Sequence, residues 1–284
     1  NLVNRLVDEG HHVIVLDDLS TGDIYNINPS AEFHRVDISE QPFFDMLQDV
    51  DVVFHLAAFA RVEPSIQDPI KSNRINVNGT LNLLKACVDY KVKKFVFTSS
   101  SAVYGEANTP TTEENPTNPM SPYALNKLIG EEYCKLFSDL YKLQTVSLRY
   151  SNAYGEGQPT EGAYCNVMGI FESQKMAGKP MTIVGDGKQK RDFTYVGDVV
   201  NANIAAAISN KVGAGEVINV GNGDNRSVNQ IADLIGGDRI NIPPRIEPRE
   251  TLANIKKAKE LLNWEPTQKI EDWMPKYKKD LNIE

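Results

Sequence analysis

The sequence predicts an α/β protein, in which a doubly wound parallel sheet is followed by a smaller α/β domain. In the first half of the chain, short apolar runs of strand length alternate with longer stretches of helical periodicity. This alternation favours a parallel sheet with helices on both faces. From Glu156 the chain changes to Gly- and Pro-rich loops with shorter elements, as is typical of a domain boundary. We therefore predict one domain over residues 1–155 and a second over 156–284.

The composition limits the class of protein. The 284 residues are 24% charged and 41% apolar, with a formal net charge of -8. These values describe an ordinary globular protein and argue against nonspecific binding to nucleic acid. Every apolar run is shorter than the ~18 residues that suggest a membrane span, and no signal peptide is visible. The three cysteines and four histidines show no disulfide or metal-site spacing, so we expect a cytoplasmic protein without a bound metal.

The predicted elements of the first domain follow from the position of apolar residues, caps and breakers. In chain order they are a helix over 1–9, strands over 12–17, 32–36 and 51–58, a helix over 70–90, a strand over 94–97, a helix starting at 121 and a strand over 144–149. The strand over 12–17 ends in Asp17. An acid at that position of a dinucleotide-binding unit accepts hydrogen bonds from the adenosine ribose, which favours NAD over NADP.

Two stretches near the middle of the chain carry the candidate chemistry. The first runs from Thr98 to Gly105 and places serines directly after the apolar strand over 94–97. The second begins with Ser121 and Pro122, which suit a helix start. On the helix that follows, Tyr123 and Lys127 are four residues apart and share one face. A strand-end serine and this Tyr-Lys pair can therefore converge on one small volume.

Such a cluster suits proton transfer. A free phenol has a pKa of ~10, so a tyrosine that acts as a base near neutrality needs that pKa lowered by ~3 units. One cation about 4 Å away, at an effective dielectric constant of ~20, supplies roughly this effect. We expect Lys127 to be that cation, helped by a bound oxidised nicotinamide. A serine hydroxyl would hydrogen-bond the substrate oxygen. Without further context, a solvent-exposed Tyr and Lys on an ordinary helix would be the simpler interpretation.

The motifs Ser-Ser-Ser-Ala-Val-Tyr-Gly (99–105) and Ser-Pro-Tyr-Ala-x-x-Lys (121–127) resemble the active site of the extended short-chain dehydrogenase/reductase family, and most closely its UDP-hexose 4-epimerases. The resemblance covers almost the whole chain. It implies a Rossmann-type first domain to which residues 192–210 return, NAD as cofactor, a UDP-sugar substrate and a homodimer. In the family, a first strand and a glycine-rich turn precede the residues that resemble 1–9. Neither is found in this sequence, so we expect the parallel sheet to lack its central strand.

The resemblance also implies site residues. The catalytic residues would be Ser100, Tyr123 and Lys127. The cofactor-binding residues would be Asp17, Asp18, Asp37, Ile38, Leu56, Ala57, Ala58, Asn76, Ser99, Tyr123, Lys127 and Tyr150. The substrate-binding residues would be Ser100, Ser101, Asn152, Tyr164, Val167, Arg191, Phe193, Arg245, Glu247 and Thr251.

Within the substrate set, arginines would contact the diphosphate, because their planar fork suits phosphate oxygens. The chain is one residue shorter than the family beside Arg245, so Arg249 is an alternative to it. Glu247 would contact the uridine ribose. Thr251 takes the place of a residue that is bulky in relatives excluding N-acetyl sugars, so we expect room for an acetamido group.

The implied activity is that of an isomerase that inverts C4 of UDP-glucose or UDP-galactose, and of their N-acetyl counterparts, through a transient 4-keto sugar. Two alternatives remain open. Dehydratases and decarboxylases of the family carry acids directly after the catalytic hydroxyl, where this chain has Ser101 and Ala102. A non-catalytic dinucleotide sensor usually lacks the Tyr or the Lys, and both are present here.

Overall fold

The computed structural model describes residues 1–40, 44–160, 165–244 and 247–281. Contacts between residues divide the chain into two compact units. Unit 1 comprises residues 1–100, 119–148 and 202–217, and unit 2 comprises 101–118, 149–201 and 218–284. The segments over 101–118 and 149–155 group with unit 2, whereas the predicted boundary is at residue 155. Residues 202–217 group with unit 1, which overlaps the return predicted over 192–210.

In unit 1, the strands of the described residues form two separate sheets. Strand β1 (Ile14–Asp17) pairs in parallel with β2 (Glu32–Arg35). Strand β3 (Val52–His55) pairs in parallel with β4 (Lys94–Ser100). The second ladder has the order β3-β4-β5-β9, with β5 at Gln144–Tyr150 and β9 at Ala214–Val220. The α/β class and the parallel strands predicted from the sequence are thus confirmed.

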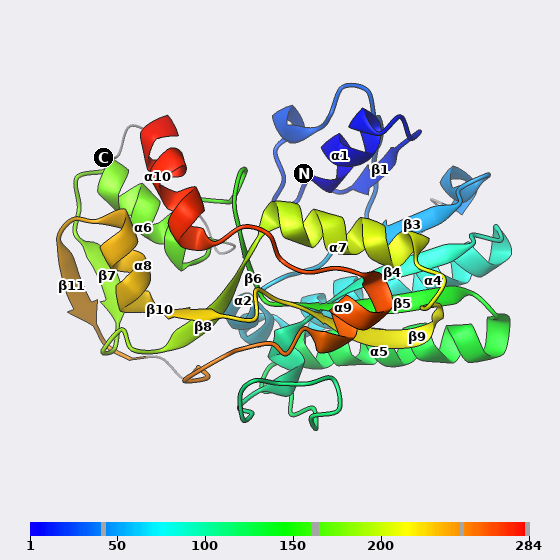
Figure 1. Ribbon diagram of the computed structural model, residues 1–284. Helices are drawn as coiled ribbons and strands as arrows, with labels where there is room; N and C mark the ends of the chain where they lie inside the picture. Colours follow the sequence, from blue (N-terminus) through cyan, green and yellow to red (C-terminus); the bar gives the residue numbers. More distant parts are fainter. Residues whose placement is uncertain (41–43, 161–164, 245–246, 282–284) are drawn as a thin grey trace. The chain divides into compact units, whose positions relative to one another are not determined.

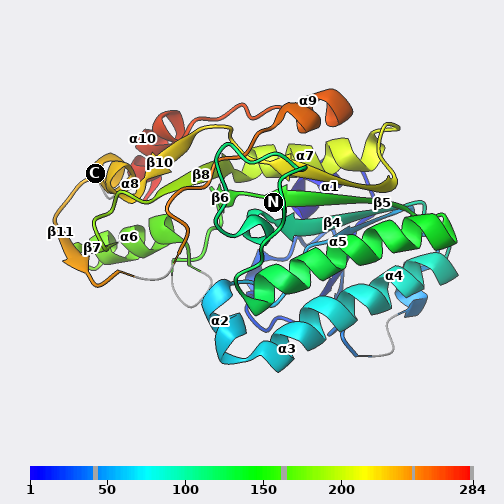
Figure 2. The same cartoon turned by 90° about the horizontal axis from the view of Figure 1, so that it is seen from below.

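Helices lie on both sides of the four-stranded ladder, with α5 below β4 and β5 in Figure 1 and α7 above them. The helices that contribute to unit 1 are α1 (Leu2–Asp8), α2 (Val62–Gln67), α3 (Pro69–Asn73), α4 (Gly79–Asp89), α5 (Pro122–Tyr141) and the second half of α7 (Val196–Ile208). Figure 2 shows α4 and α5 side by side. The helix predicted over 70–90 is interrupted by a π-helical turn at Arg74–Asn78, which separates α3 from α4.

Helix α5 begins and packs as its residues dictate. The Ser121 side chain accepts a hydrogen bond from the Ala124 N–H at 3.2 Å, and Pro122 occupies the first turn. Gly130 faces Phe97 of β4 so closely that a Cβ atom there would lie 2.3 Å from the ring. This contact brings α5 against β4, within a core that includes Leu84, Phe95 and Cys134.

Among the described residues, unit 2 contains short sheets and several α-helices of its own. Its strands are β6 (Asn152–Tyr154), β7 (Met181–Val184), β8 (Lys190–Tyr195), β10 (Asn225–Ser227) and β11 (Arg239–Ile242). The sheet orders are β10-β8-β6 and β11-β7. Its helices are α6 (Val167–Met176), α8 (Val228–Ile235), α9 (Lys256–Leu262) and α10 (Ile270–Asp280). Tyr154, Phe171 and Trp273 belong to its hydrophobic core. None of the helices described here is both long and apolar enough to cross a membrane.

Replacing Gly130 by Ala tests the close contact between α5 and β4. Alanine favours a helix over glycine by up to ~1 kcal/mol, but the new methyl group would overlap the buried Phe97 ring. Overpacking of this kind costs ~1–3 kcal/mol, so we expect Gly130→Ala to unfold at a lower urea concentration than the unmodified protein. Alanine at exposed Glu132 on the same helix is the matched control. A midpoint for Gly130→Ala at or above that of the unmodified protein would contradict this packing.

Candidate functional site

Lys127 is a buried cation at the centre of the candidate site in unit 1. Its ammonium group donates a hydrogen bond to the Thr98 carbonyl oxygen at 2.7 Å and lies 5.1 Å from the centre of the Phe97 ring. The side chain is only 3% exposed. Burial lowers the pKa of Lys127 to about 8, against the opposing effects of Cys134 and Glu131. The ammonium group therefore keeps most of its charge near neutral pH.

Tyr123 lies one helical turn before Lys127, as the sequence predicts. The Lys127 Nζ atom is 5.9 Å from the centre of the Tyr123 ring. The predicted lowering of the phenol pKa, however, is wrong for the protein alone. Burial raises the pKa of Tyr123 above its ordinary value, although a hydrogen bond with Ser100 and the charge of Arg61 oppose that rise. Burial disfavours the tyrosinate form, and Lys127 directs its ammonium group to the Thr98 carbonyl.

The serines at the end of β4 have distinct environments. Ser100 forms the hydrogen bond with the Tyr123 phenol, which places the predicted catalytic hydroxyl beside the predicted base. Ser99 is buried and donates its hydroxyl to Glu131. Sequence reasoning missed Glu131, although it follows Lys127 by four residues and so lies on the same helix face. Ser100, Tyr123 and Lys127 are therefore brought together within unit 1.

The loop after β3 contains the predicted cofactor residues Leu56, Ala57 and Ala58, of which Leu56 is exposed. Asn76 of the π turn holds this loop. Its side-chain oxygen accepts from the Phe59 N–H at 2.7 Å, and its side-chain nitrogen donates to the Phe59 carbonyl at 3.1 Å. The amide of Asn76 thus fixes the backbone of this loop.

His55, the last residue of β3, is a neutral core residue. Burial lowers the pKa of His55 to about 3, and the charge of Lys127 acts in the same direction. Its Nε2 atom lies 2.8 Å from the Thr80 hydroxyl. That hydroxyl itself lies 2.6 Å from the Asn76 carbonyl oxygen, to which it donates. Thr80 must therefore accept from His55, so the imidazole proton is on Nε2.

Acidic residues follow the other parallel strands. Asp17 ends β1 with an exposed side chain, and its Oδ1 accepts from the Leu19 N–H at 2.7 Å. Asp18 accepts from the Ser20 N–H at 2.8 Å. An exposed carboxylate at the end of a parallel strand is the acceptor that an adenosine ribose requires, so the residues present fit a dinucleotide.

Asp37 and Ile38 follow β2. Burial raises the pKa of Asp37, but hydrogen bonds from Ser39 and the ion pair with Arg74, at 3.0 Å, outweigh this effect and hold it below its ordinary value. Ile38 is buried in the core of unit 1, where its side chain would contact a Cβ atom at Gly79. The structure therefore gives the two residues different surroundings, one charged and one apolar.

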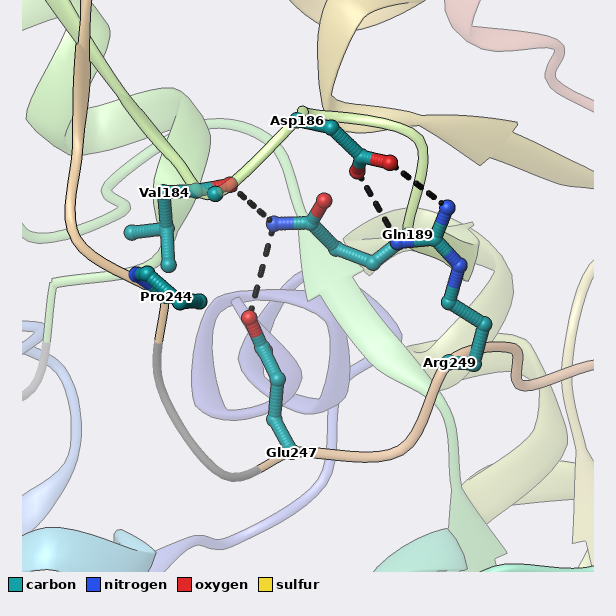
Figure 3. A pocket seen from close by; sticks show the side chains of 7 residues that line it. Val184, Asp186, Gln189, Pro244, Glu247 and Arg249 are labelled. Carbon is teal, nitrogen blue, oxygen red and sulfur yellow. Dashed lines mark hydrogen bonds and ion pairs between the residues drawn. The ribbon is translucent and has the colours of Figure 1, made fainter.

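Unit 2 contains a cavity of about 310 Å³ lined by Val184, Gly185, Asp186, Gln189, Pro244, Glu247 and Arg249. Figure 3 shows that Asp186 and Arg249 face each other at one side of it. Two hydrogen bonds of 2.9 Å join them. Gln189 donates to the Val184 carbonyl oxygen at 3.0 Å and to Glu247 at 3.4 Å. The cavity thus combines an apolar wall with convergent polar groups, as small-molecule sites do.

Arg191 and Glu247, both predicted to bind substrate, are joined by an ion pair of 2.5 Å. The guanidinium of Arg249 also lies beside a carboxylate, and it holds the pKa of Asp186 well below its usual range. Arg245 and Tyr164 lie outside the described residues. The structure therefore places Glu247 and the alternative arginine, Arg249, at one cavity.

Thr251 is fixed by Asp192 of β8, a residue that sequence reasoning missed. The Thr251 hydroxyl accepts from the Asp192 N–H at 3.3 Å. The Asp192 carboxylate accepts from the N–H groups of Asn222, Gly223 and Ala253 at 2.7, 3.2 and 3.1 Å. Burial raises the pKa of Asp192 to about 6 despite these bonds. An acid between Arg191 and Phe193 in a predicted charged cluster gave no sequence signal for such a role.

The remaining predicted substrate and cofactor residues lie on several elements of unit 2. Thr251 and Ser101 line a second, smaller pocket together with Tyr104, Ser151 and Asn219. Asn152 of β6 pairs with Phe193 of β8, and Phe193 is buried. Tyr150 ends β5, and Val167 begins α6.

Comparisons with known proteins show the family to which the chain belongs. Residues 1–221 match the model of the NAD dependent epimerase/dehydratase family. A putative UDP-glucose 4-epimerase of Methanocaldococcus jannaschii is 40% identical over 292 residues, covering 96% of this chain and 94% of that protein.

Two solved structures are similar over most of their length. A UDP-N-acetylglucosamine 4-epimerase from Methanobrevibacter ruminantium, in complex with UDP-N-acetylmuramic acid, has a TM-score of 0.91 and 34% identity over 96% of this chain and 91% of its own. A UDP-glucose 4-epimerase of Thermus thermophilus, in complex with NAD, has a TM-score of 0.87 and 32% identity over 96% of this chain and 92% of its own. The chain belongs to the NAD dependent epimerase/dehydratase family, whose cofactor is NAD.

Proposed function

We propose that this protein is an NAD-dependent 4-epimerase of UDP-hexoses. The observation that carries the proposal is the cluster of Ser100, Tyr123 and Lys127, in which a hydroxyl and a buried cation flank one phenol. This set suits the removal of a proton from a sugar hydroxyl. The relatives described above act on UDP-sugars, which supports the same substrate class here.

The cavity in unit 2 is the proposed site for the nucleotide. Its arginine and Gln189 offer donors suited to phosphate and base oxygens, and Glu247 offers acceptors for a ribose. When UDP binds, Arg191 and Arg249 would exchange part of their pairing with Glu247 and Asp186 for the ligand. Assembly as a homodimer stays a prediction.

In the proposed mechanism, Tyr123 takes the proton from the sugar 4-hydroxyl and Ser100 hydrogen-bonds the same oxygen. Bound NAD supplies the acceptor and the donor of hydride. Asp17 and the loop after β3 would hold it, and Lys127 keeps a positive charge beside the Tyr123 ring. Tyr123 returns its proton to the oxygen of the 4-keto sugar at the end of the cycle, so the residue is regenerated.

The state of Tyr123 in the protein alone has a consequence for this mechanism. Because burial raises its pKa, the phenol is protonated at neutral pH. Each unit by which the pKa of Tyr123 must fall requires about 1.4 kcal/mol of additional stabilisation of the tyrosinate. The phenol can therefore act as a base only when additional positive charge is close to it. Proton transfer is therefore expected only in the complex with the oxidised cofactor.

Removing the phenol hydroxyl tests the assignment of the base. We expect Tyr123→Phe to lower turnover of UDP-glucose by roughly 10²–10⁴-fold, the usual contribution of a general base. Affinity for the UDP-sugar, measured by calorimetry, is expected to stay within a few-fold. Phenylalanine at the exposed Tyr141 of the same helix serves as control. Turnover of Tyr123→Phe at the rate of that control would remove Tyr123 from the mechanism.

Replacing Thr251 by Tyr tests substrate breadth. The protein is expected to turn over UDP-N-acetylglucosamine at least comparably to UDP-glucose, because threonine leaves space for the acetamido group. A tyrosine would fill that space, and overpacking of ~1–3 kcal/mol corresponds to roughly tenfold or more in kcat/KM. Thr251→Ser keeps both the space and the hydroxyl that Asp192 binds, so it serves as control.

The measurement compares both substrates side by side in all three proteins. The expected result is a selective loss of the N-acetyl substrate in Thr251→Tyr. If the unmodified protein rejects that substrate, or if the tyrosine lowers turnover of both sugars equally, Thr251 does not control the size of the sugar that binds.

A further inference from the structure

The segment over 249–254 extends the sheet that contains β8. The Lys190 N–H donates to the Arg249 carbonyl at 2.9 Å, and the Thr251 N–H donates to the Lys190 carbonyl at 3.1 Å. These two bonds form one step of a parallel ladder. Because β10 pairs with β8 at Lys190, the segment lies on the opposite edge of β8, which β6 occupies from Phe193 onward.

At the next step of this ladder, side chains take the place of the backbone. A regular parallel ladder would join the Ala253 N–H to the Asp192 carbonyl and the Asp192 N–H to the Thr251 carbonyl. Here the Ala253 N–H donates to the Asp192 carboxylate at 3.1 Å, and the Asp192 N–H donates to the Thr251 hydroxyl at 3.3 Å. The Thr251 carbonyl accepts from the Asn225 side-chain amide at 3.2 Å. Asp192 thus holds the segment on both sides of Leu252 through side-chain oxygens.

The other edge of the segment pairs with Thr111. The Thr111 N–H donates to the Leu252 carbonyl, and the Asn254 N–H donates to the Thr111 carbonyl, both at 2.8 Å. Thr111 and residues 250–253 all line the smaller pocket of unit 2. One wall of that pocket is therefore a single extended segment that is bonded along both of its edges.

Asp192 also joins this wall to a further segment. Its buried carboxylate accepts from the N–H groups of Asn222 and Gly223 at 2.7 and 3.2 Å. The packing beside it is close, since a Cβ atom at Gly221 would lie 2.7 Å from the Asp192 carboxylate and 2.6 Å from the Ala253 Cβ atom. A buried polar group whose bonds are all made is rigid. The position of Ala253 is therefore tied to that of Asp192.

We propose that Asp192 positions the wall of the smaller pocket and thereby controls how the sugar of a UDP-sugar is held. It is a positioning residue that acts through Ala253 and through Thr251, the residue expected beside an acetamido group. Thr251 then contributes its hydroxyl as well as its small size, because that hydroxyl is the acceptor for the Asp192 N–H. The inference rests on the proposed function, because it assumes that this pocket binds the sugar.

Asparagine at position 192 tests this positioning. One carboxylate oxygen of Asp192 accepts from Asn222 and the other from Gly223 and Ala253. An amide has a single oxygen, so its NH₂ group must face N–H donors on one side. The quantity measured by calorimetry is the affinity for UDP-N-acetylglucosamine relative to that for UDP alone. We expect this ratio to fall roughly tenfold in Asp192→Asn, as for other ligands in a poorly fitting pocket.

Asp198→Asn is the matched control. Asp198 is buried like Asp192, and its carboxylate accepts from the N–H groups of Thr267 and Gln268 at 2.9 and 3.1 Å. None of these control residues lines either of the two pockets described above. Asp198→Asn therefore loses comparable bonds elsewhere in unit 2, and it is expected to keep the affinity ratio of the unmodified protein.

A second pair of variants separates the hydroxyl of Thr251 from its size. Thr251→Val keeps the shape of the side chain but removes the acceptor for the Asp192 N–H, whereas Thr251→Ser keeps the acceptor. We expect the ratio to fall in the valine variant and to stay unchanged in the serine variant. This pair decides the matter even if Asp192→Asn does not fold, which thermal unfolding would show.

These binding measurements need no turnover, so the two proposals can fail separately. If the protein binds UDP-sugars without epimerising them and the ratio still falls in Thr251→Val, the proposed function fails while the positioning by Asp192 stands. An unchanged ratio in Thr251→Val, or in folded Asp192→Asn, overturns the positioning. So does an equal fall in Asp198→Asn, or equal behaviour of the valine and serine variants. No measurable binding of UDP-sugars to the unmodified protein would overturn both proposals.

Discussion

The hydrogen bond between the buried Lys127 ammonium and the Thr98 carbonyl is the interaction on which the candidate site depends. Moving a charge into a protein interior is costly unless partners compensate for the lost water. Here the carbonyl, the faces of two aromatic rings and the nearby Glu131 supply that compensation. It is possible only because Gly130 lets α5 approach β4 so closely. Packing between one helix and one strand therefore determines where the cation lies, and hence which phenol it can influence.

Unit 2 uses a different kind of interaction to fix its loops. Buried carboxylates accept hydrogen bonds from backbone N–H groups of segments that are distant in sequence. Asp192 binds the segments around Asn222 and Ala253, and Asp198 binds the N–H groups of Thr267 and Gln268 at 2.9 and 3.1 Å. Each carboxylate accepts several backbone hydrogen bonds at once, and hydrogen bonds to a carboxylate are stronger than those between neutral groups. Residues predicted to contact substrate, such as Thr251, thus depend on acids that do not themselves resemble binding residues.

Much of the site could be predicted because its information is local. Helix periodicity brings Tyr123 and Lys127 to one face, and a strand end places Ser100 beside them. The pKa of Tyr123 could not be predicted, because burial depends on every element around the phenol. Asp192 was missed because its partners are 30 to 61 residues away. Assignments to Arg245 and Tyr164 stay predictions.

The π turn at Arg74–Asn78 has a consequence for how the chain can vary in length. Such a turn contains one residue more than an α-helical turn closed in the same way. Deleting one residue there would give a regular α-helix and leave the following residues in nearly the same orientation relative to the preceding ones. If the same residues were wound as a regular α-helix, the following residues would instead be rotated by about 100°. The amide that holds Phe59 and the hydroxyl that accepts from His55 could then no longer both reach their partners. The turn thus lets this helix carry one additional residue while keeping the contacts on both sides of it.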